Sequence, residues 1–143
     1  MDTTRSVALM AMLALAAAGA NAQSQKIRQV QARQEAELAK DVERTNKTCA
    51  SGLEVKFDWR AVPADALEKF SAEGYCDALL EGVRRICVDQ PGRNAVKEQI
   101  KRIVCGFGSE RAISLKDGAL DYKINFNSVN DSDFVYAYLT NNL

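Results

Sequence analysis

Two carboxylates are the side chains in this sequence whose spacing best suits catalysis. Glu73 and Asp77 stand four residues apart beside Tyr75, so they lie on one face of a predicted helix. Two carboxylic acids at the right separation can hydrolyse a glycosidic bond. Acids at the start of a helix also stabilise it through the helix dipole, which explains this pair more simply. A histidine-free glycan hydrolase is therefore the third of the three functional hypotheses below.

The absence of histidine removes most other side-chain chemistry. Pairing of serine or cysteine with histidine, and the common zinc sites, both need an imidazole, and none of the 143 residues is histidine. The sequence also has no glycine-rich phosphate loop, no nucleophile-elbow motif and no pair of cysteines separated by two residues. We therefore expect a protein that is not an enzyme and that carries no cofactor.

The segment from Asn127 to Asp133 is rich in side-chain oxygens, which are the ligands that calcium prefers. It lacks the spaced acids, central glycine and distal glutamate of an EF-hand loop. Capping of the helix predicted to follow explains these residues more simply. We therefore predict no metal site.

Basic residues form the most distinctive surface pattern. Arg93, Lys97 and Lys101 recur every four residues, which makes a stripe along one face of a helix. Asp89 and Glu98 are the only acids nearby. Such a surface can attract a carboxylate-rich or phosphate-rich partner, although a solvated face paired with acids elsewhere is the simpler interpretation. The basic stripe, as we define it, comprises Arg84, Arg85, Arg93, Lys97, Lys101 and Arg102.

The charge of the whole chain limits the kind of partner. Lysine and arginine number 19, and aspartate and glutamate also number 19, so the formal net charge is zero. Proteins that bind nucleic acid or anionic membranes usually carry an excess of positive charge. We therefore expect a protein partner rather than nucleic acid or a membrane surface.

The stretch from Gly74 to Gly106 has the pattern of a helical hairpin. Its first half carries apolar residues at helical spacing, and its second half repeats the pattern. The turn-forming segment from Asp89 to Gly92 separates the halves. Cys105 lies off the apolar stripe of the second half, so the helix must end or loosen there.

Four cysteines predict two disulfides in an oxidising compartment. In an antiparallel hairpin, residues equally far from the turn face each other, which pairs Cys76 with Cys105. Cys87 is too close to the turn to reach either of them, which leaves it to Cys49. Four cysteines allow three pairings, and the sequence alone does not choose among them.

Residues 1–22 resemble a secretory signal peptide. A positive charge precedes an apolar run, and Ala20-Asn21-Ala22 matches a cleavage site. The apolar run is too short to span a bilayer, although an uncleaved anchor is the alternative. We expect a bacterial protein of the periplasm or the secreted fraction, with no stable membrane insertion after cleavage.

The remaining chain divides into a helical arm or linker, residues 23–48, and one disulfide-stabilised domain, residues 49–143. The arm favours helix by composition, but its apolar stripe is thin, so we expect it to be solvated or to serve for docking. The domain should contain a strand at Leu53–Arg60, a short helix at Ala64–Phe70, the helical hairpin, a β-hairpin around Asp117-Gly118 and a last helix. These elements predict an α+β fold. A three-stranded antiparallel sheet packs against the stapled helical hairpin and the C-terminal helix.

Three functional hypotheses follow from these features. The first is a non-catalytic binding protein, for example an inhibitor or immunity-type protein, that holds another macromolecule through the basic stripe. The second is a structural or adaptor protein that acts through its N-terminal helix. The third is the glycan hydrolase. The sequence does not identify the partner, the process or the oligomeric state.

Overall fold

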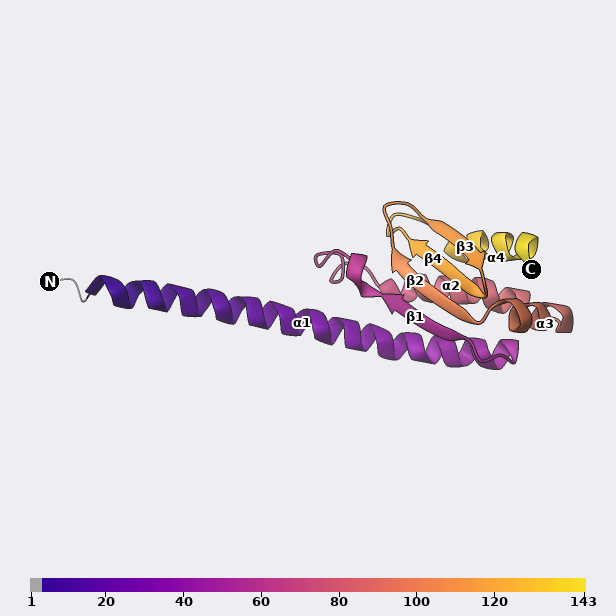
Figure 1. The fold of residues 1–143 in the computed structure, drawn as a ribbon, viewed down its shortest axis with the longest axis horizontal. Coiled ribbons are helices and arrows are strands. Elements are labelled where there is room, and N and C mark those ends of the chain that lie inside the picture. Colours follow the sequence, from indigo (N-terminus) through magenta and orange to yellow (C-terminus); the bar gives the residue numbers. More distant parts are fainter. Residues whose placement is uncertain (1–3) are drawn as a thin grey trace.

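The computed structural model describes the backbone of residues 4–143 and the side chains of residues 24–143 (Figure 1). The predicted signal peptide, residues 1–22, lies outside the residues whose side chains are described, so its cleavage stays a prediction. Within the described residues, no helix combines the length and the apolar character needed to cross a bilayer.

Helices and strands are mixed along the chain, with most of the strands in its second half. Their order is α1 (Thr4–Cys49), β1 (Glu54–Asp58), the 3-10 helix η1 (Trp59–Ala61), α2 (Ala72–Ile86), α3 (Gln90–Gln99), β2 (Arg102–Phe107), β3 (Ala112–Lys116), β4 (Ala119–Ile124) and α4 (Asp131–Asn142). The short helix expected at residues 64–70 is wrong, because this segment forms isolated turns in which the amides of Lys69 and Phe70 donate to the carbonyl of Ala66. So few residues do not repay the cost of nucleating a helix.

The sheet confirms the α+β class but differs from the expected three antiparallel strands. The described strands form a mixed sheet in the order β1-β2-β4-β3. β2 runs parallel to both β1 and β4, and only the pairing of β3 with β4 is antiparallel. β1 therefore pairs with β2, not with the hairpin. The hairpin itself is confirmed, with Asp117 (φ 50°) and Gly118 (φ 75°) at the two positive-φ positions of a tight turn.

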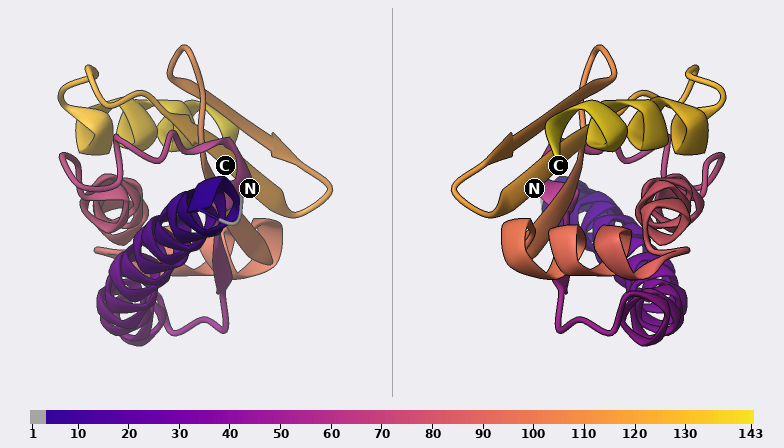
Figure 2. Two further views of the ribbon diagram at one scale, coloured as in Figure 1. Left: turned by 90° about the vertical axis from the view of Figure 1, so that its left-hand side faces the viewer. Right: turned by 90° about the vertical axis from the view of Figure 1, so that its right-hand side faces the viewer.

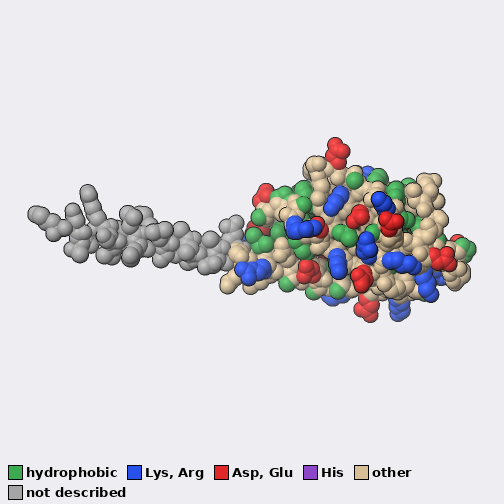
Figure 3. Space-filling model, viewed as in Figure 1, with side chains coloured by type: hydrophobic (Ala, Val, Ile, Leu, Met, Phe, Trp, Pro, Cys, Tyr) green, Lys and Arg blue, Asp and Glu red, His purple; other side chains and the backbone are tan. Residues whose placement is uncertain are grey.

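One face of the sheet is apolar and carries the helices. Figure 2 shows α1, α2 and α4 side by side on this face, with α2 in the middle. The opposite face is open, and Figure 3 shows basic and acidic side chains mixed over it. The residues that share the helix-covered face are Val55, Phe57, Ile103, Cys105, Phe107, Ile113, Leu115, Leu120, Tyr122 and Ile124.

Helix α2 forms the centre of the core. The hydroxyl of Ser71 accepts from the amide of Gly74 and caps the first turn. Leu79, Leu80 and Val83 are fully buried, because the α1 side, the α4 side and the sheet side of α2 are all covered. Helix α2 therefore positions every other helix relative to the sheet.

The predicted helical hairpin is wrong in its second half. The side chain of Asp89 accepts from the amide of Gly92 and starts α3, but the helix ends at Gln99, where the chain becomes extended at Ile100. The following residues form β2, one of the two inner strands of the sheet, and include β-branched Ile103 and Val104, which favour strands. The off-stripe position of Cys105 was the sign of this change from helix to strand.

The prediction of a solvated arm is wrong for the second half of α1. From Gln34 onward this helix packs along α2, and the two helices run in the same direction. Leu38 and Thr45 are buried in this contact. The thin apolar stripe is sufficient because polar side chains complete the contact.

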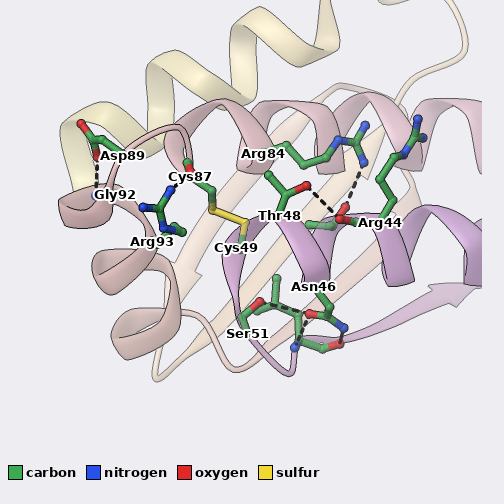
Figure 4. Close-up of a disulfide and its surroundings, with 12 residues drawn as sticks. Arg44, Asn46, Thr48, Cys49, Ser51, Arg84, Cys87, Asp89, Gly92 and Arg93 are labelled. Atoms are coloured by element: carbon green, nitrogen blue, oxygen red, sulfur yellow. Dashed lines mark hydrogen bonds between the residues drawn. A yellow bond between two sulfur atoms is a disulfide. The ribbon is translucent and has the colours of Figure 1, made fainter.

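The two disulfides are the predicted ones, although the helical hairpin from which they were predicted does not form in its second half. Cys76 of α2 is bonded to Cys105 of β2 (Cα–Cα 6.0 Å), which joins the central helix to an inner strand of the sheet. Cys49 at the end of α1 is bonded to Cys87 at the end of α2 (5.1 Å, Figure 4). Each disulfide is buried and adds about 2–4 kcal/mol to stability.

The contact between α2 and α4 at Gly82 predicts a steric limit. A Cβ at this glycine would lie 2.7 Å from Cγ1 of buried Val135. Gly82→Ala should therefore cost about 1–2 kcal/mol, because overpacking exceeds the gain of about 1 kcal/mol in helix propensity. Urea unfolding of the oxidised protein measures this loss. Gly52→Ala is the control, because a Cβ there meets nothing within 4 Å. Equal stability of the two variants would contradict the close contact.

Candidate partner-binding surface

The residues of the predicted basic stripe come from three elements and do not form one surface. Two of them, both on α2, take part in contacts within the protein. Three of the others lie near the junction of α3 and β2, and Arg93 lies in the first turn of α3, beside Cys87. The six positions are Arg84 and Arg85 on α2, Arg93 and Lys97 on α3, Lys101 after α3, and Arg102 on β2.

Arg84 is an internal structural residue and is only 8% exposed. Its guanidinium donates to Asp77 (2.9 Å), to Glu81 (2.7 Å) and to the hydroxyl of Thr45 on α1 (2.9 Å, Figure 4). Burial lowers the pKa of this guanidinium, but the hydrogen bonds that it donates to Asp77 and Glu81 outweigh this effect and raise the pKa above the usual value. Arg84 therefore holds α1 against α2 and is not available to a partner.

Arg85 joins α2 to α4. Its guanidinium donates to the carboxylate of Asp133 (2.6 Å) and lies 4.2 Å from the centre of the Tyr136 ring. A cation held over an aromatic face and paired with a carboxylate has little charge left to attract another protein. This residue, too, stabilises the helix layer.

The remaining four cations, Arg93, Lys97, Lys101 and Arg102, form a surface that we name the basic end. None of them makes an ion pair with a side chain in the described part of the chain. Arg93 donates to the carbonyl of Cys87 (3.0 Å), and Lys101 donates to the carbonyl of Lys97 (2.6 Å). Carbonyl groups orient these side chains but do not neutralise their charge. The basic end therefore keeps most of its positive potential.

A shallow depression of about 490 Å³ lies beside the basic end. Three cations of the basic end contribute to its lining, and Glu54 is the only acid that does so. No local sequence pattern indicates that Glu54 lies beside Arg102, because their proximity comes from the parallel register of β1 and β2. The full lining is Ser51, Gly52, Glu54, Lys97, Ile100, Lys101 and Arg102.

The two carboxylates considered for catalysis have different surroundings. Asp77 is engaged by Arg84 (2.9 Å) and by Arg44 of α1 (3.2 Å). Burial raises the pKa of Glu73; the Ser71 hydroxyl, which donates to it (2.9 Å), acts in the opposite direction, and Asp41 raises it further. Asp77 thus belongs to the interface of α1 and α2, which is a structural role for one member of the pair.

The oxygen-rich segment before α4 has a different role from the predicted one. Asn130 occupies the N-cap position of α4 in a left-handed conformation, and its side chain makes no capping hydrogen bond. Asp131 is buried instead and accepts hydrogen bonds from the hydroxyls of Tyr122 and Ser128. Burial of the Tyr122 hydroxyl and its hydrogen bond to Asp131 raise the Tyr122 pKa. Among the described residues, no cluster of three or more His, Cys, Asp or Glu side chains is placed to hold a metal ion.

Comparisons with known proteins provide no relative. No protein-family model, no curated protein and no solved structure matches this chain significantly.

The different roles of Arg84 and Arg85 predict different costs of mutation. Arg84→Met leaves Asp77 without its buried partner and should cost about 3 kcal/mol. Arg85→Met removes a more exposed pair and a cation–π contact and should cost about 1 kcal/mol. Denaturant unfolding of the two variants compares these losses, and equal losses would contradict an internal role for Arg84.

The raised pKa of Glu73 predicts a pH-dependent effect of Glu73→Gln. The raised folded-state pKa favours folding of the wild type below the unfolded pKa of about 4.3, and this benefit is lost as the pH rises through the folded pKa. The variant should therefore be slightly more stable than the wild type at neutral pH, by an amount that solvent screening keeps small. The difference should vanish in acid. Thermal unfolding of the wild type and the variant, at neutral pH and in acid, tests this prediction. A variant that is less stable than the wild type at neutral pH would contradict it.

Proposed function

We propose that this chain is a non-catalytic protein of the bacterial periplasm or the secreted fraction, and that it holds another macromolecule as a binding or inhibitor-type protein. Two buried disulfides fit an oxidising compartment, where such bonds persist. They also fix the helices on the sheet, and a rigid scaffold loses little conformational entropy when it binds.

The observation that carries this proposal is the basic end. Four cations gather there without an ion-paired acid among the described residues, while the chain as a whole is neutral. Local charge of one sign steers association with a surface of the opposite sign. The partner in this proposal is a protein with an acidic face that covers the depression beside Lys97 and Arg102.

Charge reversal of the basic end tests this proposal. The oxidised chain is immobilised and exposed to envelope and secreted fractions, and the bound proteins are measured by quantitative mass spectrometry. The variant Lys97→Glu, Lys101→Glu, Arg102→Glu should retain at least tenfold less of the specific partner, and added salt should weaken binding by the wild type.

The matched control reverses three lysines elsewhere on the surface, at Lys26, Lys40 and Lys69. These lysines are exposed, and the control changes the net charge by the same amount. It should retain the partner at the wild-type level. Equal loss in both variants would show a general charge effect, and full retention by the basic-end variant would remove this surface from the proposal.

A further inference from the structure

The outer edge of β1 exposes backbone groups that can pair with another strand. β1 is the first strand in the sheet order and has a neighbour, β2, on one side only. The amide of Glu54 points toward β2, where it donates to the carbonyl of Lys101 (3.4 Å). Because successive residues of a strand point in opposite directions, the amides and carbonyls of Val55 and Phe57 point away from β2. No hydrogen bond in the described structure uses these four groups.

At the other edge of the sheet, an outward backbone group already has a hydrogen-bond partner. β3 is the strand at that edge, and the outward amide of Leu115 donates to the hydroxyl of Tyr138 on α4 (2.8 Å). Helix α4 therefore occupies part of the β3 edge, as proteins commonly do to prevent unwanted strand pairing. The β1 edge has no equivalent partner in the described residues.

An apolar groove of about 510 Å³ lies beside the β1 edge, between this strand and α1. The hydrogen bond from Trp59 Nε1 to Glu35 (2.6 Å) bridges the two walls, and the Trp59 ring lies against Phe57 with centroids 4.3 Å apart. The groove is lined by Glu35, Leu38, Ala39, Val42, Val55, Lys56 and Phe57. Side chains that share the face of Val55 and Phe57 would enter it.

We propose that the β1 edge binds an extended segment of a partner protein as an additional antiparallel strand. Two residues of the segment exchange backbone hydrogen bonds with Val55 and Phe57, and their apolar side chains fill the groove beside α1. The charged side chains of β1 determine which residues fit at the other positions of the bound segment. Glu54 and Lys56 are exposed and make no ion pair in the described structure, so a basic residue fits opposite Glu54 and an acidic residue opposite Lys56.

The same charges disfavour a second copy of this chain as the occupant. The antiparallel register that uses both Val55 and Phe57 would place Lys56 opposite Lys56 of the other copy. It would also place Glu54 opposite Asp58. Like charges directly opposite each other destabilise a strand pair. A register centred on Val55 would bring Glu54 opposite Lys56, but it places Phe57 opposite Leu53, whose amide and carbonyl are already hydrogen-bonded to Asn46. The edge therefore favours a segment of complementary charge that pairs with both Val55 and Phe57. This inference shares only Glu54 with the depression beside the basic end, and its tests change other residues, so each proposal can fail without the other.

A designed peptide tests the inference directly. Its central sequence, Lys-Val-Glu-Val-Lys with flanking threonines, places valine opposite Val55 and Phe57 and glutamate opposite Lys56. Added in excess to the oxidised full chain, it should slow hydrogen exchange at the amides of Val55 and Phe57 at least tenfold, as measured by NMR. The same peptide with both valines N-methylated cannot donate to β1 and should give no protection.

A pair of protein variants completes the test. Val55→Pro removes an outward amide without disturbing the pairing of β1 with β2, because proline is tolerated where the missing N–H faces solvent. It should weaken peptide binding at least tenfold, whereas Val55→Thr should bind nearly as well as the wild type. Unchanged disulfides and circular dichroism confirm that both variants fold.

Three results would overturn the inference. The first is equal protection by the normal and N-methylated peptides. The second is no protection of Val55 and Phe57 at saturating peptide. The third is protection that grows with protein concentration in the absence of peptide, which would identify a second copy as the occupant.

Discussion

The covalent link between Cys76 and Cys105 joins the central helix, α2, to an inner strand of the sheet, β2, and the rest of the structure is arranged around it. With α2 fixed on β2, α1 and α4 pack on its two sides and complete a layer over one face of the sheet. The second disulfide, between Cys49 and Cys87, fixes the end of α1 to the end of α2. All of these helices lie on one face, so the other face and the β1 edge remain open to solvent.

This arrangement explains how polar residues divide between structural and binding roles. Arg84 and Arg85 lie on α2, the most enclosed helix, and their charges are used to join it to α1 and α4. Arg93 and Lys97 lie on α3, and neither makes an ion pair among the side chains that the structure describes. The same helical spacing in the sequence therefore gives internal ion pairs in one helix and an exposed positive surface in the next.

The sequence predicted the features that local patterns determine. The α+β class, the turn at Asp117-Gly118 and the last helix follow from short-range periodicity and turn chemistry. The assignment of β2 to a helix failed because its apolar residues, read alone, fit either period, and only pairing with β1 and β4 makes them a strand. The ion pairs of Arg84 and the unpaired backbone groups of Val55 and Phe57 depend on how distant segments pack together. No local sequence pattern predicts them.

The pairing of the cysteines is the most direct test, because the position of every helix depends on it. Trypsin cuts between all four cysteines, which then lie in the separate peptides 48–56, 70–84, 86–93 and 103–111. Mass spectrometry of the non-reduced digest should find peptide 48–56 joined to 86–93, and 70–84 joined to 103–111. A link between 70–84 and 86–93, or between 48–56 and 103–111, would contradict this arrangement of the helices on the sheet.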